Sequence, residues 1–350
     1  MPRKGLKYKK RKRGYRRRLC APKKGCPRYS GTKKLFASCR ADVAGDDDFC
    51  GFDVAPLPPK PADEGICMLS LFDGIGTSIL ALDSIGIPVR KYYSSEVDEK
   101  ANMVLKFNHS SRITMIGCVT TISNDTLESL DNINLLLGGS PCQQISRANP
   151  LRKGLQAPGS SASLFYEYVR IRDHLAKLAK DRNENFFWLF ENTFCMDNVT
   201  LVEMTRCLGT QPAMRCASGY GSAMKRKRYW WGNIPHLHDL PKSQVEYPNL
   251  QDFLMPYRSA GVPLLPTLTS TFHSQLCGKE KSLPVIESNQ RAPLLLTEIE
   301  ELFGVGRHYT DVGISQSDRR RLLGNAWAVP VVVDILKHLK AEFCKATSVD

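Results

Sequence analysis

The sequence predicts an α/β protein built on an open, mainly parallel β-sheet, with a loop-rich region towards its C-terminal end. Short apolar runs alternate along the chain with amphipathic stretches, as expected for buried parallel strands joined by helices. Several of these runs end in glycine or in a reactive side chain. Because open α/β sheets bind ligands at the carboxyl ends of their strands, the same pattern predicts a site along that edge.

Length and composition limit the class of protein. The chain has 350 residues, of which 42% are hydrophobic, enough to bury a sizeable core. We find no apolar run approaching the roughly 18 residues of a membrane span, and no apolar core of a secretory signal, so we expect no membrane partner. Its 12 cysteines are scattered, which indicates thiols in a reducing compartment.

The basic charge is concentrated at the N-terminus. Residues 1–40 hold 17 of the 49 Lys and Arg residues and no Asp or Glu, whereas the rest of the chain has 32 basic against 35 acidic residues. Such a block is solvated and attracted to phosphates. It predicts nuclear targeting, nucleic-acid binding or both, with a merely solubilising tail as the alternative.

Four regions are expected: a basic tail and Pro-rich linker (1–64), a catalytic and cofactor-binding core (65–234), a target-recognition region (235–300) and a C-terminal return to the core (301–345). Four cysteines in the first region lack the close C-x2–4-C pair typical of zinc modules, so no metal site is predicted and zinc binding there stays open. They are Cys20, Cys26, Cys39 and Cys50.

The core is expected to begin with a nucleotide-type unit. A buried strand over 66–72 ends in the glycine turn 73–77, and a helix follows over 78–85. A second strand, 91–95, ends in Glu96, and an acid about 20 residues after such a turn can bind ribose hydroxyls. Taken alone, this pattern is common.

The next strands lead to a thiol. One is expected over 113–116, and another over 133–137 runs into two glycines, Pro141 and Cys142. If a helix or turn begins near Gln143, its free N–H groups would favour the thiolate. A lone cysteine is more often a small buried residue, so the functional interpretation rests on the rest of the chain.

Later elements extend the sheet. We expect a mobile loop over 145–162, a helix over 164–178, and a strand over 186–190 that ends in Glu191, whose alternative role is a cap or surface ion pair. A hairpin-like pair (215–222 and 229–231) follows.

The C-terminal part has a different pattern. The stretch 235–300 has eight prolines and little periodicity, which predicts a loop-rich subdomain. Helices are expected to end at 299–303, to start over 318–323, and to close the chain over 331–343.

Together, the predicted edge offers a thiol, a carboxylic acid, paired arginines, a glycine turn and a ribose-type acid. Methylation of a pyrimidine carbon uses this set. A thiolate added at carbon 6 of cytosine makes carbon 5 nucleophilic, an acid neutralises ring nitrogen 3, and an arginine holds the carbonyl oxygen.

The sequence resembles the cytosine-5 DNA methyltransferases, and most closely the animal de novo branch. The matching motifs occur in family order across about residues 66–345: Leu69–Ile75, Gly138–Cys142, Arg152–Leu155, Phe187–Asn192, Arg228–Asn233, His308–Val312, and Arg321–Gly324 with Trp327 and Val329-Pro330. The resemblance implies a Rossmann-like S-adenosylmethionine-dependent methyltransferase sheet with a small target-recognition subdomain. It also implies S-adenosyl-L-methionine as cofactor and a flipped cytosine in double-stranded DNA as substrate.

The resemblance also assigns roles by position. Cys142 would be the nucleophile and Glu191 the acid, with Arg226 and Arg228 in support. The expected cofactor residues are Phe72, Asp73, Gly74, Ile75, Gly76, Thr77, Glu96, Val97, Cys118, Val119, Thr120, Asn325, Ala326 and Trp327. The expected DNA-binding residues are Arg152, Lys153, Thr271, Phe272 and His273.

Three departures from the family pattern bear on function. Cys118 stands where the family has an adenine-contacting acid, and Gln143 follows the nucleophile where Asn is usual. The stretch 271–274 lacks the basic residue that reads guanine, which predicts looser CpG selectivity unless Arg258 or Lys279 replaces it.

The resemblance implies a nuclear protein that forms homo-oligomers or pairs with a related methyltransferase. Phe165 and Tyr166 would form one contact, and Asp311 with Arg319 a second, although both sets could be intramolecular instead. Two alternatives to an active DNA enzyme are an inactive regulatory paralogue and an RNA cytosine-5 methyltransferase. The joint presence of Cys142, Glu191 and Arg228 argues against the regulator, and the C-terminal motifs favour DNA over RNA.

Overall fold

The structure is a computed structural model that describes residues 65–155, 157, 160–239 and 248–344. The basic tail and linker predicted for 1–64, with their four cysteines, lie outside the described residues.

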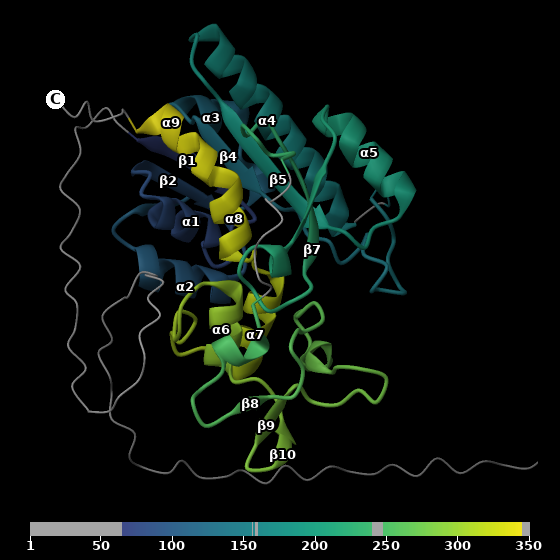
Figure 1. Ribbon diagram of the computed structural model, residues 1–350. Helices are drawn as coiled ribbons and strands as arrows, with labels where there is room; N and C mark the ends of the chain where they lie inside the picture. Colours follow the sequence, from purple (N-terminus) through teal and green to yellow (C-terminus); the bar gives the residue numbers. More distant parts are fainter. Residues whose placement is uncertain (1–64, 156, 158–159, 240–247, 345–350) are drawn as a thin grey trace, which may run out of the picture. The chain divides into compact units, whose positions relative to one another are not determined.

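The larger sheet has seven strands in the order β3-β2-β1-β4-β5-β7-β6 (Figure 1). Neighbouring strands from β3 to β5 are parallel, and β7 is antiparallel to both β5 and β6. In chain order the strands are β1 (Ile66–Leu71), β2 (Val89–Ser95), β3 (Ile113–Met115), β4 (Leu135–Gly138), β5 (Phe187–Thr193), β6 (Ala213–Cys216) and β7 (Lys227–Gly232). The strand order reverses between β1 and β4, so ligands are expected beyond the carboxyl ends of these two strands.

Helices cover both faces of this sheet because its central strands are apolar on both sides. In β1, Ile66 and Met68 belong to one buried cluster, while Cys67, Leu69 and Leu71 belong to the other. The first cluster includes α1 (Thr77–Ile85), α2 (Glu99–His109) and α8 (Val329–Leu336); the second includes α3 (Asn124–Ser129), α4 (Leu164–Asp181) and α5 (Asn198–Leu208). This arrangement confirms the Rossmann-like fold class.

The target-recognition region contains a small sheet of three antiparallel strands, β8 (Ser259–Ala260), β9 (Val285–Glu287) and β10 (Gln290–Ala292). It is followed by α6 (Leu296–Phe303), α7 (Gln316–Asn325) and, after α8, the short α9 (Lys340–Phe343). Its buried residues, such as Leu250 and Val285, join the same cluster as one face of the larger sheet. The region therefore shares a core with the catalytic part.

Some expected boundaries were wrong. Glu191 lies inside β5 rather than after it, and the closing helix is divided into α8, a 3-10 turn and α9. Helices α2 and α5 were not predicted. Both are capped by aspartates: Asp98 accepts from the N–H groups of Lys100 and Ala101, and Asp197 accepts from that of Thr200.

By length and composition alone, the helical stretch Gln316–Phe343, with a mean hydropathy of 1.3, is long and apolar enough to cross a membrane. Such a stretch was not predicted from the sequence. Within the fold, 61% of its apolar window is buried. It contains α7 and α8, and α8 packs against α1. The stretch behaves as a core element of this fold, so the length and composition are weak evidence for a membrane segment.

Candidate active site

The predicted cofactor edge starts at the turn after β1. Phe72 has a positive φ of 56°, and Gly74 and Gly76 have φ of 61° and 76°, so the chain reverses tightly there. A Cβ added at Gly74 would meet nothing within 4 Å, whereas one at Gly76 would lie 2.8 Å from Leu105. The turn thus has open space on one side and closely packed α2 on the other.

Asp73 supports this turn from inside. Its carboxylate accepts hydrogen bonds from the hydroxyls of Ser70 and Ser94, both at 2.6 Å, and from Tyr92. Burial raises the pKa of Asp73 to about 6, against the lowering effect of these donors. Both carboxylate oxygens face the interior, so Asp73 shapes the turn and does not offer its carboxylate to a ligand.

Glu96 joins the turn to the end of β2. One carboxylate oxygen accepts from the N–H of Gly74, and the other accepts from those of Val97 and Asp98, all at 2.8 Å. A carboxylate has about four lone-pair sites, so Glu96 still has capacity to accept from a ribose diol. Val97, beside it, is 67% exposed and offers an apolar surface. This combination of a hydrogen-bond acceptor and an apolar surface fits an adenosyl group.

The remaining predicted cofactor residues differ from one another in how far they are buried. Cys118 is half-buried with Sγ 3.1 Å from Thr120 Oγ1, and Val119 is buried. Beyond α7, Asn325 is exposed and Ala326 is buried. Ile75 and Thr77, within the first turn, are also buried.

The loop after β4 presents the thiol. A Cβ on Gly138 would lie 2.9 Å from the Tyr168 ring, and Gly139 is equally confined. Asn192 fixes the loop from β5, donating from Nδ2 to the carbonyl oxygen of Ser140 at 3.1 Å. Cys142 follows in a half-buried position.

The expected lowering of the Cys142 pKa was wrong for this state. A turn does begin at Gln143, but the N–H groups of Ile145 and Ser146 donate to the carbonyl of Cys142. Burial raises the pKa of the Cys142 thiol, and the charge of Glu191 raises it further, while Arg228 and Arg226 lower it. The thiol is therefore mainly protonated at neutral pH.

Glu191 is 9% exposed and both its oxygens have partners. Arg228 Nε lies 2.9 Å from Oε1, and the indole Nε1 of Trp327 donates to Oε2 at 2.9 Å. Trp327 was expected to contact the cofactor, and its bond to the acid was missed. Only the fold brings residues 191 and 327 together, so no local signal could have shown this.

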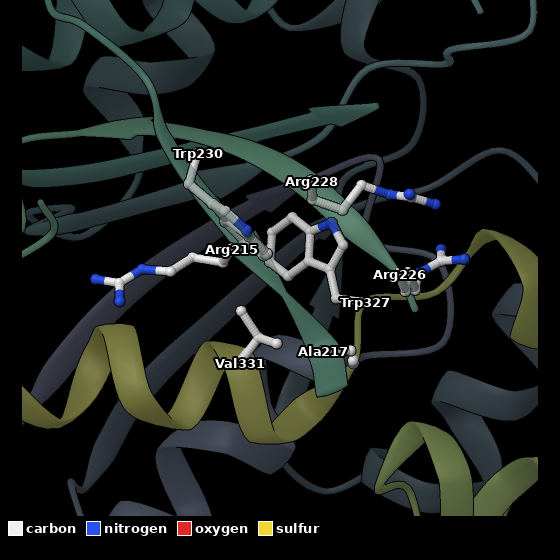
Figure 2. Close-up of a pocket in the computed structure, with 8 residues that line it drawn as sticks. Arg215, Ala217, Arg226, Arg228, Trp230, Trp327 and Val331 are labelled. Carbon is white, nitrogen blue, oxygen red and sulfur yellow. The ribbon is translucent and has the colours of Figure 1, made fainter. Parts of the chain in front are cut away.

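The two arginines differ in surroundings. Arg228 faces Glu191, but Arg226 is buried and donates to the carbonyls of Leu268 at 2.7 Å, Gly324 at 3.1 Å and Ala326 at 2.8 Å. Burial and the charge of Arg228 hold the pKa of Arg226 well below its usual value. Arg226 therefore ties the target-recognition and C-terminal segments to the β6–β7 hairpin. Figure 2 shows its side chain near Trp327.

The residues expected to bind DNA lie on the surface. Arg152, Lys153, Thr271 and His273 are exposed, and Phe272 is 41% exposed. The 3-10 turn Phe272–Gln275 follows Thr271.

A basic residue that was not predicted lies beside this surface. Arg320 from α7 has its guanidinium carbon 5.4 Å from the Phe272 ring centre. The proposed substitute Arg258 is 2% exposed and paired with Glu298 at 2.9 Å and Glu287 at 2.7 Å. Arg258 is therefore a structural residue.

The expected oligomer contacts are occupied inside the chain. Phe165 is fully buried, with its ring 5.3 Å from that of Phe190, so it is not available to a partner. Arg319 is paired with Asp311 at 3.1 Å and with Glu300 at 3.0 Å. The intramolecular alternative holds for Phe165 and for the Asp311–Arg319 pair. Within the described ranges, there is no cluster of three or more metal-binding side chains.

Comparison with known proteins agrees with this geometry. Residues 66–176 match the family model described as C-5 cytosine-specific DNA methylase. Over this segment the chain is similar to the cytosine-5 DNA methylases.

Curated relatives of the chain include two plant proteins. The DNA (cytosine-5)-methyltransferase DRM2 of Arabidopsis thaliana is 34% identical over 117 residues, which is 31% of this chain and 18% of that protein. DRM2 of Oryza sativa subsp. japonica is 32% identical over 120 residues, 32% of this chain and 20% of that protein. The match thus spans about a fifth of the length of these relatives.

Solved structures with a similar fold cover more of the chain. A mutant DNMT2 of Spodoptera frugiperda superposes with a TM-score of 0.59 and 18% identity, covering 78% of this chain and 99% of that one. The Dnmt2 methyltransferase of S. pombe gives a TM-score of 0.54 and 16% identity, covering 79% and 98%. The methylase fold therefore continues well beyond residue 176.

Proposed function

We propose that the protein is a DNA (cytosine-5)-methyltransferase of the de novo type that uses S-adenosyl-L-methionine. The observation that carries this proposal is the convergence of Cys142, Glu191 and Arg228 at one end of β4, β5 and β7, next to a glycine turn that fits an adenosyl group. The matches to plant DNA (cytosine-5)-methyltransferases support the same chemistry.

The residues divide the reaction among them. When bound, S-adenosylmethionine supplies an electrophilic methyl group. The Cys142 thiol passes its proton to Glu191, the thiolate adds to carbon 6 of a flipped cytosine, the ring electrons shift, and Glu191 gives that proton to ring nitrogen 3. After methylation at carbon 5, a base removes the carbon-5 proton and the sulfur leaves, which restores the thiolate.

The resting site opposes this reaction until substrate arrives. The charge of Glu191 raises the pKa of Cys142, and Arg228 Nε lies 2.9 Å from Glu191 Oε1. Transfer of the thiol proton to Glu191 would remove that charge from beside the sulfur and leave a thiolate, when ring nitrogen 3 is present to take up the proton. The geometry thus links nucleophile activation to the presence of cytosine.

The proposal includes the cellular location of the protein, the role of its basic N-terminal region and its self-association. The basic residues of 1–40 are proposed to direct the protein to the nucleus and to bind DNA phosphates. Self-association is kept as a proposal, through surfaces other than Phe165 and the Asp311–Arg319 pair. Light scattering at micromolar concentration, with and without DNA, tests it.

A transfer assay on the full chain tests the function. Labelled S-adenosylmethionine is supplied with a mixed-sequence DNA duplex or with structured RNA, and methylated positions are mapped at base resolution. We expect Cys142→Ser to abolish transfer, because an alcohol is far less nucleophilic than a thiolate. Cys195→Ser, at an exposed thiol, is the matched control and should retain activity.

Three outcomes separate the alternatives. Transfer to DNA that depends on Cys142 supports the proposal, and transfer restricted to RNA supports an RNA methyltransferase. DNA binding without any transfer supports the regulatory paralogue. Glu191→Gln should slow transfer by roughly 100-fold, as the loss of a positioned acid does.

A further inference from the structure

The candidate acid is held by a tryptophan that comes from the C-terminal segment. Trp327 lies between α7 and α8, 136 residues beyond Glu191, and its indole Nε1 donates to Glu191 Oε2 at 2.9 Å. Figure 2 shows its ring between Trp230, Arg228 and α8. The ring meets Trp230 edge-on, with centroids 5.4 Å apart, beside a cavity of about 10 Å³.

The contact leaves the acid little freedom. Its other oxygen is paired with Arg228 at 2.9 Å, and a Cβ built on Gly139 would meet both Glu191 Oε2, at 2.9 Å, and Trp327 Nε1, at 3.3 Å. Four chain segments therefore meet around one carboxyl group. The carboxyl is aimed by its two donors and confined by the loop that carries Cys142.

Building on the proposed function, we infer that Trp327 is a positioning residue that aims Glu191 at ring nitrogen 3 through its indole N–H. An indole N–H only donates, so it stabilises the carboxylate more than the carboxylic acid. Arg228 acts in the same sense from the other oxygen, and Arg226 and Cys142 are the other titratable groups that face this site.

The chemistry gives Trp327 two opposing effects. By orienting the carboxyl, its N–H raises the transfer rate, and by favouring the ionised form, it makes the proton harder to acquire at high pH. The side chain of Trp327 thus serves the acid, while its backbone belongs to the segment expected to line the cofactor. One residue then links the two halves of the site.

A pair of matched substitutions tests this role. Trp327→Phe keeps an aromatic ring against Trp230 but removes the N–H that donates to Glu191. Trp230→Phe makes the same chemical change at the neighbouring ring and leaves the hydrogen bond to the Glu191 side chain in place. Single-turnover transfer to duplex DNA is measured from pH 6 to 9, with thermal unfolding of each variant. We expect Trp327→Phe to be about 10-fold slower at neutral pH. In the plot of its transfer rate against pH, the decline on the alkaline side should shift to higher pH by about one unit.

The control variant, Trp230→Phe, should show the alkaline decline of the transfer rate at the same pH as the wild type. If Trp327 had a purely structural role, Trp327→Phe would lower the transfer rate without shifting its alkaline decline, and that result overturns the inference. An equal shift in Trp230→Phe overturns it as well.

A second measurement does not depend on activity. The indole proton and nitrogen signals of the chain's four tryptophans are followed by NMR against pH, assigned by Trp→Phe variants. We expect the Trp327 signal to titrate in the wild type and to lose that titration in Glu191→Gln, while the Trp230 signal stays constant. A Trp327 signal indifferent to Glu191→Gln overturns the inference even if Trp327→Phe fails to fold.

The two readouts separate the inference from the proposed function. If the wild type transfers no methyl group to DNA but the Trp327 signal reports Glu191, the function fails and the positioning contact stands.

Discussion

Gly139→Ala adds a single methyl group at the centre of the site. Gly139 lies between β4 and the Cys142 loop, and its φ is not among the positive values, so an alanine there is not strained by its backbone. Its Cβ would lie 2.9 Å from Glu191 Oε2, 3.1 Å from the Glu191 main-chain oxygen and 3.3 Å from Trp327 Nε1. The substitution therefore probes the position of the acid and little else.

The size of the effect follows from these distances. Ordinary contacts begin at 3.4 Å, so the acid must move by about half an ångström. The main chain of Glu191 is held in β5 by its pairing with Trp230 of β7, so the side chain takes most of the movement, and the Glu191 main-chain oxygen and Trp327 each give by a few tenths of an ångström. Overpacking of this kind costs about 1–3 kcal/mol. If that cost falls on the transition state, the rate falls about 5- to 150-fold.

The assay is single-turnover transfer to duplex DNA, with DNA affinity measured separately. We expect the transfer rate to fall within that range, with DNA affinity changed less than about threefold, because the added methyl group contacts Glu191 and Trp327 and none of the expected DNA-binding residues. Gly219→Ala is the matched control, since a Cβ there meets nothing within 4 Å and its φ is not positive. A wild-type transfer rate in Gly139→Ala would refute the placement of Glu191 as the acid.

Four further results are expected. Arg226→Met should lower the free energy of unfolding by about 3 kcal/mol in urea titrations, because three carbonyls lose their buried donor. Since the folded pKa of Asp73 is raised to about 6, stability falls by about 3 kcal/mol as pH rises from about 3 to about 7, and Asp73→Asn should flatten this dependence in denaturation curves. Deleting residues 1–40 should lower the slope of log affinity against log salt by about 0.9 for each phosphate group that the tail neutralises. Methylation should extend to cytosines before adenine, because 271–274 has no Lys or Arg; base-resolution mapping checks this.

Each of these has a clear contrary result. Unchanged unfolding of Arg226→Met would make Arg226 a purely catalytic group, and an unaltered pH dependence in Asp73→Asn would remove that carboxyl as its source. An unchanged salt slope would leave the tail a targeting role only. Confinement to CpG by 100-fold or more would point to Arg320, which lies over Phe272, as the residue that reads guanine.

The sequence predicted the parts of the site whose geometry is local. The glycine turn, Glu96 and Cys142 each follow directly from a strand, and a strand's carboxyl end places what comes next. Glu191 was predicted at the right edge although β5 continues past it to Thr193.

What the sequence did not show depends on tertiary packing. No pattern reveals that the carboxylate of Asp73 turns inward to four hydroxyls. Nor does any pattern reveal that Arg226 donates to carbonyls about 40 and 100 residues away. The raised pKa of Cys142 is of the same kind, because it results from burial and from Glu191 across the sheet. Helices α2 and α5 were missed for a different reason, since exposed apolar residues such as Phe107 and Val199 blur the amphipathic pattern.

The charges around Cys142 and Glu191 explain why this thiol and this acid need not be reactive in the free protein. In the proposed reaction Cys142 has to lose a proton, yet in the free protein burial and the charge of Glu191 raise the pKa of its thiol. Arg228 and Trp327 stabilise the combination of a carboxylate and a thiol, which is the inactive one. A cytosine ring that presents nitrogen 3 to Glu191 and carbon 6 to Cys142 relieves this opposition. On this account the substrate itself completes the active protonation state, so reactivity of the thiol towards other electrophiles stays low until DNA is bound.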